Sequence, residues 1–227
     1  MRKIFVPLII FPFLLTACAS KVGNQQSVSA AAASYQAGKP EHRIRKIVYS
    51  VTEQSNAQNA QTYEQTDKFS LTSKNLLRKV STAKGKPKVE SLILMNHWEL
   101  DWKMDNNAFR SENVDLRPSP AYWSTNGENI YNSSTLVDAN GQLAWREYCQ
   151  LGAADNAAKL HKNLKGQIQL ANCNALLSNE EGTLRIVQNF QGYYLPSYQM
   201  FIPKILVVNN NANGRIDKIE YTVKSVH

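Results

Sequence analysis

The sequence is poor in the residues and motifs from which most enzymes build an active site. It has only four histidines, one of them the last residue. It contains no G-x-S-x-G nucleophile elbow, no H-E-x-x-H metal motif and no phosphate-binding P-loop. We find no internal repeat either. The sequence therefore gives little support for an enzyme, and we predict a non-enzymatic protein with no cofactor and no metal.

The N-terminal hydrophobic run is too short to cross a bilayer. It extends from Ile4 to Leu15, is interrupted by Pro7 and Pro12, and follows the basic segment Met1-Arg2-Lys3. A transmembrane helix needs roughly 20 apolar residues. A basic segment followed by a shorter apolar stretch is typical of a secretory signal.

The run ends in Leu15-Thr16-Ala17-Cys18, which resembles the lipobox of bacterial lipoproteins. The resemblance implies cleavage before Cys18 and acylation of its thiolate, so that the protein is anchored to a membrane outside the cytoplasm. Ala19 follows Cys18 where an Asp would signal retention in the inner membrane, so the same resemblance implies the outer membrane, with the domain in the periplasm or at the cell surface. The alternative is an ordinary signal peptide with a chance cysteine.

Composition then suggests how the chain is organised. We predict a signal peptide over residues 1–17, and the lipidated Cys18 with a flexible tether over residues 18–40, because that segment is small and polar with little to bury. Residues 41–227 are long enough to form a single domain with its own core.

Cysteine is scarce, with three in the chain. If Cys18 carries lipid, Cys149 and Cys173 remain as a pair in an oxidising compartment, and we expect them to form a disulfide. A metal site built on these two residues is the alternative, although it lacks a C-x-x-C spacing or a nearby histidine pair.

Short stretches of β-branched and aromatic residues between turn signals predict a mainly β domain. Residues 92–104 alternate between apolar and polar side chains and predict one long strand wetted on one face. Residues 135–150 predict a hairpin around Asn140-Gly141, and residues 71–80 have helical spacing. We therefore expect an antiparallel sheet or incomplete barrel with one or two short helices, a β-rich α+β fold.

In the C-terminal segment, Leu195-Pro196 leads into Phe201-Ile202-Pro203-Lys204-Ile205, and a glycine turn is followed by Arg215-Ile216-Asp217-Lys218-Ile219-Glu220-Tyr221. This segment is similar to the closing hairpin of the lipoprotein localisation factors. Those proteins are half-barrels that carry acyl chains, so the resemblance implies an apolar cavity. Such a cavity would be lined by large aromatic side chains, of which we single out Trp98, Trp102, Tyr194 and Phe201. The alternative is that these side chains form an ordinary core.

Two polar patterns are weaker candidates for chemistry. His97, Glu99 and Asp101 share one face of the expected strand and could form an acid/base or metal site, although an exposed sheet face is normally charged. Residues 209–220 have the spacing of a calcium loop, but their early ligand positions are asparagines, and a hairpin turn explains the Asn-Gly pair.

Positive charge is the remaining feature, because the formal net charge is +8. A basic cluster suits an anionic surface or an envelope protein, unless it is simply a solvated loop. Few aromatic residues are interleaved with it, so we expect no nucleic acid. The cluster comprises Arg78, Lys79, Lys84, Lys86 and Lys88.

Three functions follow from these features, in decreasing order of preference. The first is a lipoprotein that binds a partner or an apolar or lipid ligand in the cell envelope. The second is a structural or assembly lipoprotein that docks onto an envelope complex through its basic residues. The third is a hydrolase of envelope polymers built on His97, Glu99 and Asp101.

Overall fold

The computed structural model describes residues 40–56, 58–72, 76–104, 107–118, 129–138, 141–179, 185–211 and 213–227. These residues form one closed barrel of twelve antiparallel strands, in which each strand pairs with its neighbours in sequence and β1 also pairs with β12. The strands are β1 (Lys46–Ser55), β2 (Gln58–Leu71), β3 (Leu77–Ala83), β4 (Val89–Leu94), β5 (Trp98–Met104), β6 (Asn107–Pro118), β7 (Asn129–Asp138), β8 (Gly141–Asn156), β9 (Gln167–Ser178), β10 (Arg185–Leu195), β11 (Met200–Asn210) and β12 (Arg215–Val226).

The prediction of a mainly β, antiparallel fold is confirmed, with one difference: the barrel is closed rather than incomplete. Residues 1–39 lie outside the described part of the chain, and with them the predicted signal peptide, Cys18 and nearly all of the tether. Within the described ranges, no helix has the length and apolar character needed to span a bilayer.

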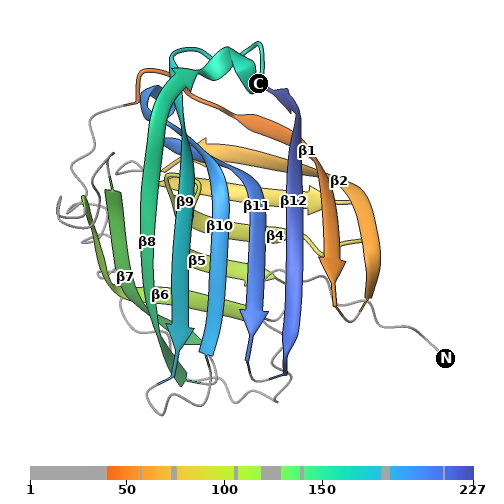
Figure 1. Cartoon of the computed structure of the whole chain (residues 1–227), viewed down its shortest axis with the longest axis vertical. Helices are drawn as coiled ribbons and strands as arrows, with labels where there is room; N and C mark the ends of the chain where they lie inside the picture. The colour runs from red at the N-terminus through yellow and green to blue at the C-terminus, as the bar shows by residue number, and fades with distance from the viewer. Residues whose placement is uncertain are drawn as a thin grey trace.

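The barrel is flattened, so that two groups of strands face each other across its interior. Strands β8 to β12 run along the long axis of the molecule, and β4, β5 and β6 cross behind them at a steep angle (Figure 1). The pairing contains register shifts, among them those at Val48/Tyr49, Leu92/Ile93 and Gln191/Gly192, and irregularities of this kind locally increase the bend and twist of a strand.

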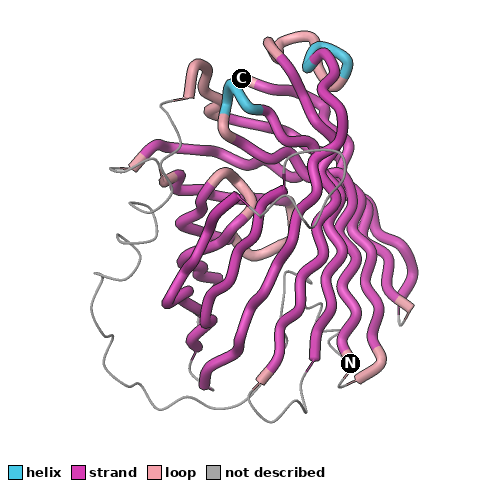
Figure 2. The backbone as a smooth tube through the Cα atoms, turned by 60° about the vertical axis from the view of Figure 1, so that its left-hand side comes forward, coloured by secondary structure: helices cyan, strands magenta, loops and turns pink. Residues whose placement is uncertain are grey.

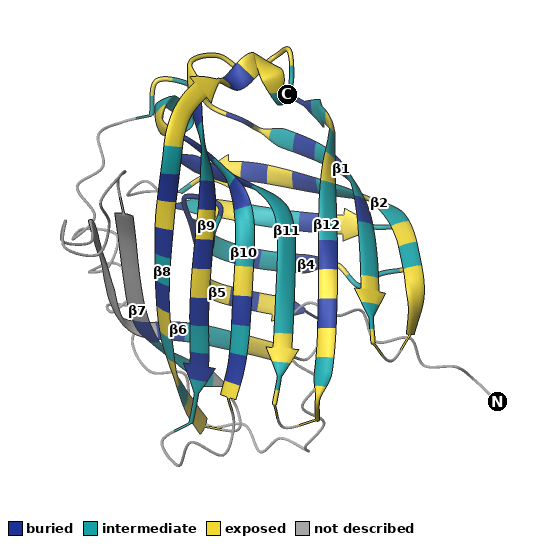
Figure 3. Cartoon of the chain, viewed as in Figure 1, coloured by how far each residue is buried: buried dark blue, intermediate teal, exposed yellow. Residues whose placement is uncertain are grey.

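Alternation along each strand separates the interior from the surface. On β2, Thr62, Glu64 and Lys68 are exposed, whereas Asp67 and Phe69 on either side of Lys68 are buried. The same alternation produces the striped burial of the long strands in Figure 3. The outer face of β2 is polar, and the inner face of the barrel carries both the core and several charged groups.

One end of the barrel is closed by apolar packing and two 3-10 helices, η2 (Ala157–Lys159) and η3 (Pro196–Tyr198). Figure 2 shows these helices at the same end as the C-terminus. The Asn156 side chain caps η2 by accepting a hydrogen bond from the Ala158 amide (2.9 Å). Backbone bonds from Arg45 and Lys46 to His227 bring the start of β1 to this end too.

Two local expectations were wrong. Residues 71–80 form no helix where they are described, because Leu77 to Val80 belong to β3 and pair with β2 and β4. The strand expected over residues 92–104 is two strands, β4 and β5, joined by a turn at Met95, Asn96 and His97. The hairpin expected over residues 135–150 is present as β7 and β8, although residues 139 and 140 of its turn lie outside the described part.

The expected disulfide is present. Cys149 on β8 and Cys173 on β9 lie directly opposite each other, with their sulfur atoms 1.99 Å apart. Both side chains face the interior and are buried. The last hairpin is present as well, as β11 and β12. Asn211 and Asn213 at its turn accept hydrogen bonds from the backbone amides of Arg185 and Arg215, which is the structural role of turn asparagines.

Candidate functional site: the barrel interior

The barrel encloses a cavity of about 200 Å³. Among the described residues, every strand except β9 contributes a side chain to its lining. Twelve strands enclose more space than the eight that side chains can just fill, so an unfilled interior is expected on geometric grounds. The lining combines an apolar wall with two groups of buried polar side chains.

The turn between β4 and β5 carries the first polar group into the interior. Met95 and Asn96 have φ angles of 54° and 55°, in the left-handed region that costs a non-glycine residue roughly 1 kcal/mol. The turn is held in place by two bonds of 2.8 Å: Asn96 Nδ2 donates to Phe201 O, and Phe201 N donates to Met95 O. The tip of this hairpin is thereby fixed against the start of β11, and His97 faces the cavity.

His97 and Trp98 share one carboxylate, that of Glu147 on β8. His97 Nε2 lies 2.7 Å from Glu147 Oε1, and Trp98 Nε1 donates to Glu147 Oε2 at 2.7 Å. The Glu147 side chain is 3 % exposed. Phe190 and Phe201 pack against the His97 ring at centroid distances of 4.2 and 5.0 Å. The orientation of the histidine is therefore held by aromatic rings and a buried carboxylate, while the residue remains part of the cavity lining.

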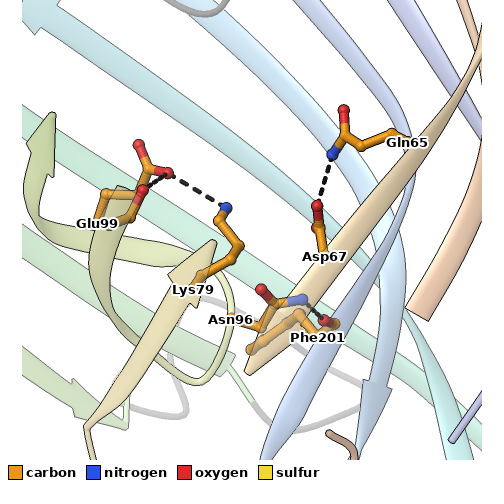
Figure 4. Close-up of polar contacts among 7 residues, drawn as sticks. Gln65, Asp67, Lys79, Asn96, Glu99 and Phe201 are labelled. Carbon is orange, nitrogen blue, oxygen red and sulfur yellow. Dashed lines mark hydrogen bonds and ion pairs between the residues drawn. The ribbon is translucent and has the colours of Figure 1, made fainter. Parts of the chain in front are cut away.

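The second polar group lies on β2, β3 and β5 (Figure 4). Lys79 Nζ lies 3.3 Å from Glu99 Oε1, and Gln65 Nε2 donates to Asp67 Oδ1 at 2.8 Å. The register shift at Leu92/Ile93 explains why adjacent residues of β5, Glu99 and Leu100, both line the cavity.

Burial and charge shift the protonation of this second group. Burial raises the pKa of the Asp67 carboxyl above its ordinary value, although Lys79 and hydrogen bonds from Ser81 and Gln65 oppose the change. Burial alone would lower the pKa of Lys79, but the carboxylates of Glu99 and Asp67 outweigh it and the pKa is raised. Lys79 therefore stays charged inside the barrel.

Two more ion pairs lie in or beside the cavity lining. Lys86 Nζ lies 2.8 Å from Glu53 Oε2 and 4.6 Å from the centroid of the Tyr63 ring, and Tyr63 donates its hydroxyl proton to Glu53. Burial, together with the Glu53 carboxylate, raises the pKa of Tyr63 well above its ordinary value. Across the cavity lining, Arg215 Nε lies 2.9 Å from Asp217.

Two polar atoms of the lining have no hydrogen-bond partner among the described residues. They are Nε2 of Gln188 on β10 and Oδ1 of Asn96. Gln188 is 6 % exposed and Asn96 is 9 % exposed. A buried polar atom without a partner costs about 1 to 3 kcal/mol, so these two atoms indicate that the cavity is incomplete as the chain alone forms it.

The four aromatic residues predicted to bind a ligand occupy different places. Trp98 lines the cavity, and Phe201 and Tyr194 lie behind it in the same buried cluster, with centroid distances of 5.4 Å from Trp98 to Phe201 and 4.9 Å from Tyr194 to Phe201. Trp102 belongs to a separate cluster, where it stacks on Phe109 at 5.5 Å. Of these four, only Trp98 is part of the cavity lining.

The acid/base set His97, Glu99 and Asp101 does not converge. His97 contacts Glu147, Glu99 contacts Lys79, and Asp101 is exposed on β5. The residue that does contact His97 through a hydrogen bond, Glu147, lies far away in the sequence. Because Glu147 is a polar residue in a strand, the sequence did not indicate that it is buried.

A metal site among the described residues was tested on the same geometry. The donor atoms of His97, Glu147, Cys149 and Cys173 lie within 4.8 Å of one another. The two sulfur atoms are bonded to each other, however, and offer no thiolate to a metal.

Much of the basic cluster is neutralised by the protein's own acids. Arg78 and Lys88 both contact Glu90, at 2.6 and 2.5 Å, and their hydrogen bonds lower its pKa to about 2. Lys79 and Lys86 are paired with interior carboxylates. Lys84 is exposed in the turn between β3 and β4. The surface charge available to a partner is thus smaller than the sequence suggests.

Comparison with known proteins gave no match to any protein-family model, to any curated protein or to any solved structure.

Proposed function

We propose that this chain is a non-enzymatic binding protein that holds a small ligand inside the barrel. The observation that carries the proposal is the cavity of about 200 Å³ with two buried polar atoms, on Gln188 and Asn96, that have no partner among the described residues. A cavity with a mostly apolar wall and a few fixed polar groups is the usual form of a small-molecule site.

The contacts of His97 favour binding over catalysis. Its Nε2 is hydrogen-bonded to one carboxylate oxygen of Glu147, and the other oxygen accepts a hydrogen bond from Trp98 Nε1. The aromatic rings packed on His97 leave its side chain 10 % exposed. A general base needs free access to the proton that it removes, so this arrangement supports a positioned wall residue.

We further propose that lipid on Cys18 anchors the protein to the bacterial outer membrane. The lipobox Leu15-Thr16-Ala17-Cys18 supports the anchor, and the polar outer faces of strands such as β2 suit a barrel held in water beside the bilayer. Cys18→Ser is expected to abolish incorporation of labelled palmitate and to release the protein from the membrane fraction. Palmitate incorporation into the variant would contradict the anchor.

The binding function is tested by filling the cavity. Val208 on β11 lines the cavity, whereas its neighbour Val207 is not in the lining. A thermal-shift screen of the purified full-length chain against one-ring and two-ring compounds should find stabilising ligands. Val208→Phe should lose them while remaining folded, and the matched control Val207→Phe should keep them. A wild-type protein stabilised by no compound, or ligands kept by Val208→Phe, would contradict the proposal.

A further inference from the structure

The cavity is rich in negative charge although the whole chain is basic. Among the residues that the structure describes, five carboxylates line it: Glu53, Asp67, Glu99, Glu147 and Asp217. The permanently basic side chains in the lining are Lys79 and Arg215, and Lys86 adds a third beside Glu53. Charges interact strongly in a poorly solvated interior. An anion entering this cavity meets net repulsion, whereas a cation meets net attraction.

Aromatic faces line the same space. Trp98, Trp145 and Phe190 belong to the lining next to Glu147 and Gln188, and Tyr63 and Tyr221 belong to it near the other polar group. The negative face of an aromatic ring attracts an organic cation. The position of Lys86 over the Tyr63 ring is an intramolecular example in this protein.

Two polar atoms of the lining have no hydrogen-bond partner in the described part of the chain. Asn96 Nδ2 donates to the Phe201 carbonyl, which can only accept, so Asn96 Oδ1 is an acceptor to which no described residue donates. Gln188 Nε2 is a donor for which the described residues offer no acceptor. Gln188 lies opposite Ala175, and Ala175 lies opposite Glu147, so a small side chain separates the amide from the carboxylate.

Size restricts the ligand further. The cavity of about 200 Å³ is smaller than the roughly 300 to 1,000 Å³ of a site for a drug-sized molecule. It therefore suits a one-ring molecule better than the acyl chain of a lipid.

From these observations, and on the basis of the binding function proposed above, we infer that the ligand is a compact organic cation. It carries a protonated amine on an aromatic or other apolar body, together with an oxygen. The amine donates to Asn96 Oδ1 and is attracted by the carboxylates, and the oxygen accepts a hydrogen bond from Gln188 Nε2.

Calorimetric titration of the purified full-length chain tests the inference with four matched probes. Tyramine has the amine and the oxygen, 2-phenylethylamine has only the amine, and 4-ethylphenol has only the oxygen. The fourth probe, 3-(4-hydroxyphenyl)propionate, replaces the amine with a carboxylate. We expect tyramine to bind most tightly and at least tenfold more tightly than the carboxylate, and palmitate not to compete with it.

Gln188→Leu separates the oxygen contact from general damage. The variant should bind tyramine only as tightly as 2-phenylethylamine, and its affinity for 2-phenylethylamine should be that of the wild type. Its unfolding midpoint should be unchanged or higher, because the substitution removes an unpartnered buried donor. Asn189→Ala, which changes an exposed residue of the same strand, is the control. If Gln188→Leu does not fold, Gln188→Met replaces it. The ranking of the four probes by their affinity for the wild-type protein tests the inference without either variant.

The outcomes distinguish the two proposals. If the carboxylate or palmitate binds as tightly as tyramine, the ligand is not an organic cation. If Val208→Phe also loses that binding, the binding function is still supported. Equal binding of tyramine and 4-ethylphenol would also overturn the cation. Absence of binding by all of these probes would overturn the cation, and the compound screen described above would decide the binding function separately.

Discussion

Individual buried polar residues hold the interior of this barrel in place through their hydrogen bonds. Glu147 is the most constrained of them, because both of its carboxylate oxygens accept hydrogen bonds and its side chain is nearly inaccessible. Its removal leaves His97 Nε2 and Trp98 Nε1 without their acceptor inside the protein.

Glu147→Ala is therefore expected to lower the free energy of unfolding by about 3 kcal/mol, measured by urea denaturation. Glu64→Ala, on the exposed face of β2, should change it by no more than about 0.5 kcal/mol. A loss of similar size in the two variants would show that Glu147 has no special role in the interior.

Asp67 allows a prediction about pH. Its folded-state pKa is raised, mainly by burial, so its ionisation opposes folding and its destabilising effect grows as the pH rises above the ordinary value of 3.8. Asp67→Asn should thus raise the free energy of unfolding at neutral pH, and the gain over wild type should shrink as the pH falls from the raised folded-state pKa towards 3.8 and be absent below it. Urea denaturation at several pH values measures this difference. A gain that grows on acidification would contradict the raised pKa.

The site residues could be predicted from the sequence only in part. Trp98 and His97 attracted attention because of their side-chain types. Asn96, Glu147 and Gln188 did not, because a polar residue in an alternating strand is normally placed on the wet face. Only the closure of the barrel, which depends on contacts far apart in the chain, turns these polar residues into interior ones.

Among the strands, β10 shows how one small residue shapes the cavity wall. A Cβ atom on Gly192 would lie 2.4 Å from Phe190 Cζ and 2.8 Å from Ile202 O. The absence of a side chain at Gly192 lets the Phe190 ring fold back along its own strand, where it packs against His97.

Gly192→Ala should consequently destabilise the protein by about 1 to 3 kcal/mol, through displacement of Phe190 and strain against β11. Gly152→Ala on β8 is the matched control, because a Cβ there meets nothing closer than 3.4 Å. Thermal denaturation compares the two. Phe190→Leu in the Gly192→Ala background should recover part of the loss, and a strictly additive double variant would show that the two residues are not coupled.

The elements themselves were more predictable than their boundaries. Alternation and Asn-Gly turns predicted strands and hairpins because those signals are local. The turn at residues 95–97 escaped notice because it contains no glycine or proline and the apolar alternation continues through it. The helical spacing of Leu76, Leu77 and Val80 was misleading because pairing with both neighbouring strands decides the conformation of β3.

At the scale of the whole molecule, closure depends on one pair of strands that are distant in sequence. Every other neighbouring pair in the barrel is also consecutive in the chain, but β1 and β12 come from opposite ends of it. Sequence patterns could not distinguish an open sheet from a closed barrel, because both have the same hairpins.

An engineered disulfide across this seam tests the closure. Ser50 on β1 lies opposite Thr222 on β12, and neither is buried. The double variant Ser50→Cys and Thr222→Cys should form a second disulfide under oxidising conditions, detectable by mass spectrometry of the linked peptides. It should stabilise the protein by several kcal/mol relative to its reduced form, because it closes a long loop. The mismatched pair Ser50→Cys and Lys224→Cys should not crosslink, and equal crosslinking of both pairs would argue against a fixed seam.

The alternation of side chains described for β2 also has a consequence for protein engineering. Neighbouring residues of one strand can be changed separately, since one side chain faces the interior and the next faces the surroundings of the barrel. Val207 and Val208 on β11 are such a pair. Substitutions at positions such as Val208 should therefore reshape the cavity, whereas substitutions at positions such as Val207 change the outer surface alone.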